Sequence, residues 1–102
     1  MSKYALYVPL EAQPGKEKQL AEFLRSALPI VNDEVGTISW FAVQEGPSRF
    51  AIFDTFDDED GRRAHLEGKV AAALMERVKA GDLLANAPEI ITLDVLADKL
   101  PG

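Results

Sequence analysis

Four short runs of apolar residues, interleaved with two longer runs of helical spacing, narrow the folds that this chain can adopt. The short runs are rich in β-branched and aromatic residues, which is typical of β-strands. They cover residues 4–11, 37–45, 49–56 and 89–97. The longer runs carry apolar residues three or four positions apart, as an amphipathic helix does. They cover residues 13–36 and about 59–79. The predicted order of elements is therefore β-α-β-β-α-β.

Glycine and proline residues indicate where these elements turn or break. The Gly-Pro-Ser sequence at 46–48 predicts a hairpin between the second and third strands. Pro9 lacks an N–H, so we expect a bulge or a lapse in pairing there. Pro29 removes one helical hydrogen bond, so the first helix should kink or end near Leu28 and continue for at most about a turn.

The second helical run contains its own start, break and stop signals. Asp57 or Asp58 can cap its N-terminus, where acidic side chains are favourable. Gly68 should bend the helix or split it in two. Gly81 predicts a left-handed C-terminal cap.

Two successive β-α-β halves predict an α+β, ferredoxin-like fold, with a four-stranded antiparallel sheet and the helices on one face. All four predicted strands, however, are apolar on both sides. The face without helices then needs another cover, and a second copy of the chain is the simplest one. We therefore expect a homodimer.

Composition limits the classes of function that are open to the chain. Its 102 residues predict a single domain over 1–102. The net charge of −6 and the scattered Lys and Arg residues argue against nucleic-acid binding. With no cysteine and one histidine, a transition-metal site has few candidate ligands. No apolar stretch reaches the roughly 20 residues of a membrane span, so we expect a cytoplasmic protein.

A short motif after the third strand resembles one known family. The segment FAIFDTFDDEDGRRAHLEG places an acidic residue, a spacer and an aromatic residue at the strand end, followed by a helix that contains a histidine. Asp54, Phe56 and His65 stand at those three positions. Together with the order of elements and the segment PGKEKQLAEFL, this resembles the antibiotic biosynthesis monooxygenase (ABM-like) family over nearly the whole chain.

The resemblance implies a dimeric α+β barrel, in which two sheets pack face to face with the helices outside. It also implies an apolar pocket between each sheet and its own helices. Some members of the family oxygenate polyphenolic or quinol-like molecules with O₂ and no metal, flavin or haem. Others bind and degrade haem, and many have no known reaction.

The chain departs from the family pattern at several positions. Asp54 stands where the family has a glutamate, and Phe56 where it has a tryptophan. Haem-degrading members place a haem-ligating histidine further along the second helix, where this chain has Ala73 and Leu74. They also use an asparagine in the first strand, and none is present here. The absence of these two residues argues against haem degradation, and we expect no cofactor.

His65 is the candidate general base, because an imidazole with an ordinary pKa of about 6.5 suits proton transfer near neutral pH. The alternative is a structural or surface histidine bonded to a neighbour. Asp54 lies on the same strand face as apolar residues, and a buried carboxylate there needs a partner. It could orient His65 or bind a substrate hydroxyl. It could equally cap the following helix or pair with an arginine.

Four further residues are candidates for substrate binding. Tyr7 and Trp40 could form pocket walls that present an O–H and an N–H to a phenolic ligand, or they could be ordinary core or interface aromatics. Arg62 could stabilise an anionic substrate at the pocket mouth, or make only local pairs along its helix. Phe56 is a candidate because it stands at the aromatic position of the family motif.

The sequence thus supports two hypotheses of different class. The first is a cofactor-independent monooxygenase that acts on a small aromatic or quinol-type molecule. The second is a non-enzymatic dimeric domain that binds a small ligand or serves a regulatory role. A pocket lined by His65 and other polar groups would favour the enzyme, and a pocket filled by Phe and Leu would favour the binding domain.

Overall fold

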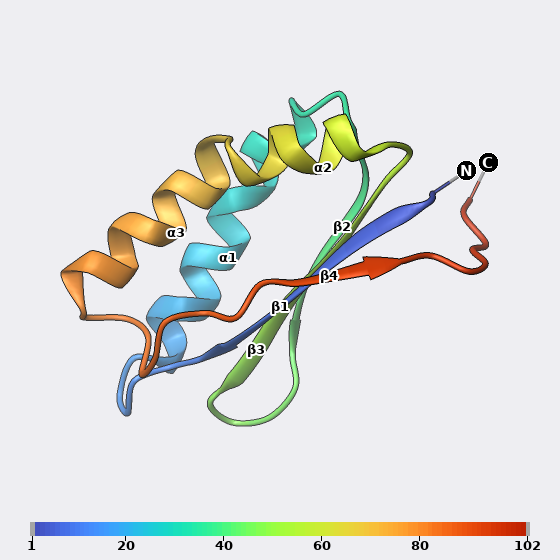
Figure 1. The fold of residues 1–102 in the computed structure, drawn as a ribbon. Helices are drawn as coiled ribbons and strands as arrows, with labels where there is room; N and C mark the ends of the chain where they lie inside the picture. The colour runs from blue at the N-terminus through green and yellow to red at the C-terminus, as the bar shows by residue number, and fades with distance from the viewer. Residues whose placement is uncertain (1, 102) are drawn as a thin grey trace.

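The structure, a computed structural model, describes residues 2–101 as one antiparallel sheet with helices packed on a single face (Figure 1). The strand order across the sheet is β2-β3-β1-β4. The strands are β1 (Tyr4–Glu11), β2 (Thr37–Gln44), β3 (Arg49–Phe56) and β4 (Ile91–Asp94). The helices are α1 (Glu17–Asn32), α2 (Glu59–Leu66) and α3 (Lys69–Ala80). The predicted ferredoxin-like α+β fold is confirmed.

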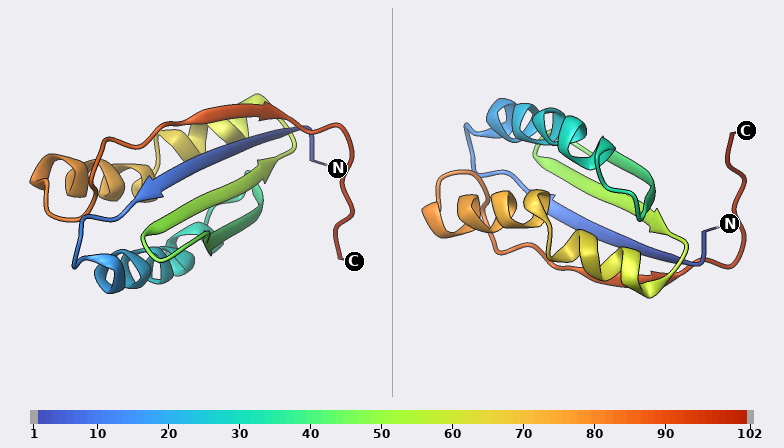
Figure 2. Two further views of the ribbon diagram at one scale, coloured as in Figure 1. Left: turned by 90° about the horizontal axis from the view of Figure 1, so that it is seen from below. Right: turned by 90° about the horizontal axis from the view of Figure 1, so that it is seen from above.

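The helices form one layer over the sheet. Figure 2 shows α2 and α3 following one another along the sheet, beside α1. The backbone N–H of Ser2 donates to Asp98 Oδ2 at 2.9 Å, which ties the start of the described chain to the segment after β4. None of the helices described in residues 2–101 is long and apolar enough to cross a membrane.

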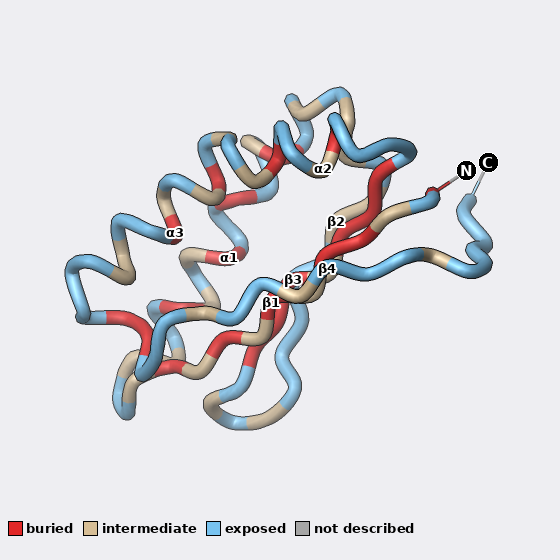
Figure 3. Tube along the Cα trace, in the orientation of Figure 1, coloured by how far each residue is buried: buried red, intermediate tan, exposed pale blue. Residues whose placement is uncertain are grey.

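The core lies between the helices and the two central strands, β1 and β3 (Figure 3). The β1–β3 register pairs Leu6 with Asp54, so both side chains point towards the helices. Most residues that share this face are apolar and buried. They include Val8, Leu10, Phe50, Ile52 and Phe56 of the strands, with Leu20 and Leu24 of α1. Asp54 is thus a fully buried carboxylate in an otherwise apolar layer.

The opposite face of the sheet carries large apolar side chains without a helix over them. The register places Tyr7 of β1 beside Phe53 of β3, and Phe53 beside Phe41 of β2. Phe41 is 54% exposed, and Val43 and Leu93 on the same face are also exposed. We call this surface the open face.

The helix ends follow the sequence signals closely, with one difference at the start. α1 begins at Glu17, so Pro14 precedes the helix, whereas the prediction began the helix near residue 13. Pro29 lies inside α1, which continues only to Asn32, as expected. The second helical run is split at Gly68 into α2 and α3. Gly81 caps α3 with a φ of 70°, in the left-handed region that glycine adopts easily.

The prediction of a bulge or a lapse in pairing at Pro9 holds in part, and the prediction for β4 needs correction. The β1–β3 ladder passes through Pro9 without a bulge, although the pairing of β1 with β4 ends at Tyr7. The irregularity in the sheet lies instead between Thr37 and Ser39 of β2. β4 is also shorter than predicted, because only four of the nine residues at 89–97 pair with β1. The remaining apolar pattern of that segment includes Leu96, whose side chain is exposed.

A contact between two glycines holds α2 against the turn that precedes β2. A Cβ built on Gly36 would lie 2.8 Å from the Cα of Gly61. A Cβ on Gly61 would lie equally close to the carbonyl oxygen of Gly36. Neither position can accept a side chain without a shift of the backbone. This contact sets the spacing between the turn at 33–36 and the helix that carries His65.

Gly36→Ala should therefore destabilise the protein by about 1–3 kcal/mol, the usual cost of overpacking a tight site. Gly46→Ala is a matched control, since a Cβ at Gly46 meets nothing within 4 Å. Urea unfolding of both variants measures the difference. Equal stability of the two variants would contradict the close packing of α2 on this turn.

Candidate functional site

The single histidine lies buried between two carboxylates from different parts of the fold. His65 Nδ1 donates to Glu34 Oε1 at 2.6 Å. His65 Nε2 lies 2.9 Å from Asp54 Oδ2, close enough for an ion pair although the contact is not a well-directed hydrogen bond. The side chains of His65 and Asp54 are 8% and 1% exposed, and that of Glu34 is 18% exposed. We call these three residues the carboxylate–histidine cluster.

The local sequence explains why His65 points inward. Asp58 caps α2 by accepting a hydrogen bond of 2.7 Å from the backbone N–H of Gly61. Gly61 and His65 are one helical turn apart, and both are buried on the face of α2 that packs on the sheet. The α2 helix thereby brings His65 over the end of β3, where Asp54 projects.

Glu34 completes the cluster from the turn between α1 and β2. Its Oε1 atom also accepts a 2.7 Å hydrogen bond from the hydroxyl of Thr37. Sequence analysis missed Glu34, because two adjacent acidic residues in the segment NDEVG have the pattern of an ordinary surface turn. Its role depends on the Gly36–Gly61 contact, which no sequence periodicity reveals.

The charges of the cluster shift the pKa values of two of its members. Burial by itself lowers the pKa of His65, but the contacts with Asp54 and Glu34 outweigh it and raise that pKa above 6.5. Burial raises the pKa of Asp54 above 3.8, although the nearby imidazole opposes this rise. The contacts with the two carboxylates therefore favour the protonated form of His65, whose ring nitrogens each lie against one carboxylate.

Two of the candidate aromatic residues lie beside this cluster. Phe56 is fully buried, and its ring centroid lies 5.6 Å from that of His65. Trp40 is directly opposite Asp54 in the β2–β3 register and faces the helices. It packs against both groups of core residues, the larger one on Leu20 and Leu24 and the smaller one on Val31.

The other two candidates lie away from His65. Tyr7 is on the open face, where its hydroxyl donates to Glu45 at 2.7 Å. That hydrogen bond raises the pKa of Tyr7 above its ordinary value. Tyr7 can therefore contact only a ligand or a partner on the open face.

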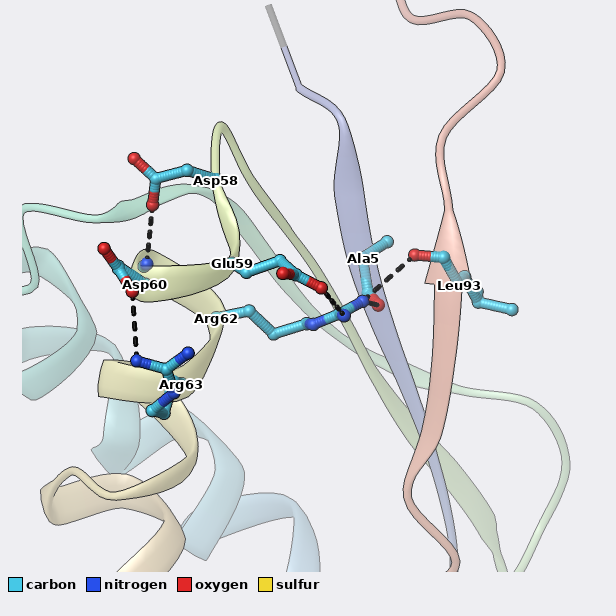
Figure 4. A network of polar contacts seen from close by, with 8 residues as sticks. Ala5, Asp58, Glu59, Asp60, Arg62, Arg63 and Leu93 are labelled. Carbon is cyan, nitrogen blue, oxygen red and sulfur yellow. Dashed lines mark hydrogen bonds and ion pairs between the residues drawn. The ribbon is translucent and has the colours of Figure 1, made fainter.

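Arg62 connects α2 to the edge of the sheet rather than to a pocket (Figure 4). Its Nη1 atom donates to the carbonyl oxygens of Ala5 and Leu93, at 3.4 Å and 3.3 Å. The guanidinium also lies 5.0 Å from the ring centroid of Tyr4 and pairs with Glu59. These contacts tie α2 to β1 and β4 across the helix-covered face.

A surface groove adjoins the outer end of the cluster. It has a volume of about 420 Å³ and lies between the end of α1 and the α2–α3 junction. Its lining includes Ile30, Asp33, Glu34, Gly68 and Lys69. On the inner side, Asp54 is fully buried, as are its register partner Leu6 and Phe56 on the same strand. Within residues 2–101, no group of three or more His, Cys, Asp or Glu residues is arranged to hold a metal ion.

Neither a protein-family model nor a curated protein matches the chain. A solved structure from Nitrosomonas europaea, of a protein of unknown function, is 54% identical to it. The match covers 100% of this chain and 97% of the other, with a TM-score of 0.95. This chain belongs to the same family as that Nitrosomonas protein.

More distant structures show how widely the fold is shared. A second Nitrosomonas europaea protein and one from Chloroflexus aurantiacus are each described as a "putative antibiotic biosynthesis monooxygenase". They are 20% and 19% identical to this chain, with TM-scores of 0.77 and 0.74. The matches cover 93% and 99% of this chain, and 91% and 100% of the other two. At this level of identity they show a common fold.

The raised pKa of His65 gives a testable pH dependence. A group whose pKa is higher in the folded state stabilises the fold fully below its unfolded pKa, and this contribution is lost as pH rises through the folded pKa. The stability advantage of the native protein over His65→Gln should therefore be larger at about pH 6 than at about pH 9. Urea unfolding at both values measures it.

Arg63→Gln is the control for this experiment, because Arg63 pairs only with exposed Asp60 on the same helix among the contacts described. The stability difference of this control should stay nearly constant over the same pH range. A His65→Gln difference that is equally constant would contradict an imidazolium held between two carboxylates.

Proposed function

We propose that the protein is a homodimeric, cofactor-independent monooxygenase that acts on a small aromatic or quinol-type molecule with O₂. The observation that carries this proposal is the carboxylate–histidine cluster, a buried proton-holding group beside two aromatic side chains. Buried titratable groups with shifted pKa values are enriched at functional sites. The shared fold of proteins described as monooxygenases gives further support.

The proposed oxygenation requires little from the protein beyond removal of a proton from the substrate and a site that excludes water. An electron-rich phenol or quinol, once deprotonated, can itself transfer electrons to O₂. One oxygen atom then enters the substrate carbon, and the other leaves as water with two hydrogens from the substrate. No outside reductant is needed for this balance. The protein would supply a base, hold the resulting anion and exclude water.

In this proposal Asp54 or Glu34 takes the proton of the substrate, and His65 contacts both carboxylates. Both ring nitrogens already contact a carboxylate, so a proton taken by Asp54 or Glu34 can be shared along the cluster. Asp54 is the member that faces Trp40 and the core, and Glu34 is the member that lines the outer groove. The cluster can thus hold a proton between the buried Asp54 carboxylate and the partly exposed Glu34 carboxylate.

The open face supports the proposed homodimer. Its exposed large apolar side chains include Phe41, Val43 and Leu93, next to Phe53 and Tyr7. Contiguous apolar patches of this kind are costly in water and mark interaction sites. Two copies that pack by these faces would leave both helical layers, and the outer groove, on the outside.

A second candidate function is a non-enzymatic domain that binds a small molecule. The groove of about 420 Å³ beside Glu34 has room for a small molecule, whereas Asp54 and its neighbours Leu6 and Phe56 are fully buried. This favours a domain that binds a ligand at its surface without using the buried carboxylate. The two candidates differ in one respect that can be measured. The enzyme consumes oxygen in proportion to the quinol that it converts, and the binding domain does not.

Asp54→Asn should slow oxygen uptake with an accepted quinol by at least roughly tenfold, the cautious end of the effect of removing an acid–base group. Asparagine keeps the size of the side chain and removes its ability to carry the proton. Arg63→Gln on the outer face of α2 should leave the rate unchanged. No oxygen uptake by the native protein with any of a panel of quinols would favour the binding domain.

Phe41→Asp should convert the dimer into a monomer, because a carboxylate on the open face would be buried without a partner. Light scattering after gel filtration should give about 22 kDa for the native protein, twice the 11.2 kDa chain, and 11.2 kDa for the variant. Val35→Asp is the control, since Val35 is 97% exposed in the α1–β2 turn. A native monomer at micromolar concentration would overturn the dimer.

A further inference from the structure

The groove on the outside of the helical layer has the size and lining of a binding site for a small molecule. It lies between the end of α1 and the α2–α3 junction and has a volume of about 420 Å³. Its apolar lining comes from Pro29 and Ile30 of α1 and Ala64 of α2. Its charged lining residues are Asp33, Glu34 and Lys69. Sites for small ligands combine apolar surface with a few polar groups in the same way.

Glu34 has one carboxylate oxygen that is available to a ligand in this groove. Its Oε1 atom already accepts from His65 Nδ1 at 2.6 Å and from the Thr37 hydroxyl at 2.7 Å. None of the hydrogen bonds and ion pairs described for Glu34 within residues 2–101 goes to Oε2. The two bonds at Oε1 hold the carboxylate in place, so Oε2 has a defined position.

Gly68 leaves space beside this oxygen and beside two carbonyl oxygens. A Cβ built on Gly68 would lie 3.5 Å from Glu34 Oε2. It would also lie 3.1 Å from the carbonyl oxygen of Ala64 and 3.3 Å from that of His65. Three oxygen atoms from three residues thus surround the side of residue 68 that carries no side chain.

The two carbonyl oxygens can accept further hydrogen bonds. Ala64 and His65 belong to the last turn of α2, where carbonyl oxygens have no partner inside the helix. The His65 carbonyl accepts from the N–H of Gly68 at 3.1 Å, and a carbonyl oxygen has a second lone pair.

These three oxygen atoms select a positively charged donor. All three are acceptors, and one belongs to a carboxylate. The C-terminal end of a helix also carries a partial negative charge, which favours a cation. A primary ammonium group has three N–H donors, one for each oxygen. An anionic ligand would meet only acceptors at this position.

The other groups at the groove agree with an organic cation rather than a metal ion. Asp33 and Lys69 have opposite charges, so together they leave the charge of the Glu34 carboxylate uncompensated on the side of Oε2. Hard metal ions usually require several oxygen ligands with more than one carboxylate. The described residues 2–101 contain no group of three or more His, Cys, Asp or Glu that could hold such an ion.

We propose that this groove binds a small primary amine. The ammonium group of the ligand donates to Glu34 Oε2 and to the two α2 carbonyl oxygens, and its apolar body packs against Pro29 and Ile30. The His65 ring separates this site from Asp54, since its two nitrogens face Glu34 and Asp54. The site goes beyond the proposed oxygenation, which makes no use of an amine.

Binding at this site should be detectable at His65. The amine and the imidazole would contact the two oxygens, Oε2 and Oε1, of one carboxylate. A cation added at Oε2 therefore changes the electric field at Nδ1. His65 is the only histidine of the chain, so its ring nitrogens report on the groove without interference from another imidazole.

Titration of the ¹⁵N-labelled protein with benzylamine, at constant pH and ionic strength, tests the site. The Nδ1 resonance of His65 should move saturably. Benzyltrimethylammonium has the same charge but no N–H donor, and benzyl alcohol has a donor but no charge. Each should bind at least roughly tenfold more weakly than benzylamine, because hydrogen bonds that involve charged groups are lost.

Gly68→Ala tests the position of the site. Its methyl group fills the space among the three oxygens, so benzylamine binding measured by calorimetry should weaken at least roughly tenfold. Gly46→Ala is the matched control, since a Cβ there meets nothing within 4 Å, and it should bind as the native protein does. Circular dichroism melting shows whether Gly68→Ala is folded, and the comparison of the three ligands on the native protein remains decisive if it is not.

Equal binding of benzylamine and benzyltrimethylammonium would indicate attraction by the net charge of the protein alone and would overturn the inference. A His65 resonance that no benzylamine concentration moves would also overturn it, as would equal affinities of folded Gly68→Ala and Gly46→Ala. Selective amine binding without oxygen uptake from any quinol would support this site and overturn the monooxygenase. Oxygen uptake without selective amine binding would overturn the amine site alone.

Discussion

The site depends on one electrostatic arrangement, the His65 imidazole buried between Asp54 and Glu34. A carboxylate as buried as that of Asp54 costs several kcal/mol unless a cation or donor compensates it. The imidazole is the only basic group described at that position. It therefore serves as the counter-ion of the sheet carboxylate and as the link to the turn that holds Glu34. Removal of the imidazole would leave two carboxylates facing each other without a cation.

Several contacts of α2 keep His65 in this position. The Gly36–Gly61 approach brings the Glu34 turn against α2, and the Asp58 cap fixes where α2 begins. Arg62 anchors the same helix to β1 and β4. A helix held from both sides allows little movement of His65. These contacts fix the position of His65 between the two carboxylates.

Much of the fold can be predicted from the sequence, because its signals are local. Period-two alternation, the Gly-Pro-Ser turn, Gly68 and Gly81 act on neighbouring residues, and they gave the element order and most helix ends. Pro9 was interpreted too strongly, since one missing N–H can be accommodated without a bulge. The length of β4 depends on how many of its residues pair with β1, and the tertiary structure decides this.

The site was predicted only in part, because the sequence signals are local and some residues of the site are far apart in the sequence. Asp54 and His65 are close in sequence, and the strand–helix geometry places both on one face. The sequence left open whether Asp54 caps a helix or contacts His65; Asp58 takes the cap, and Asp54 contacts the imidazole. Glu34 could not be found, because it joins the cluster through a long-range contact between the α1–β2 turn and helix α2.

The charge state of the single imidazole tests the account most directly. In the ¹⁵N-labelled protein the two ring nitrogens of His65 can be followed over pH without interference from any other histidine. The account predicts that the pKa of the His65 imidazole lies above 6.5, and that both ring nitrogens carry a proton at pH values below that pKa. A neutral imidazole at pH 7, titrating at or below 6.5, would contradict it.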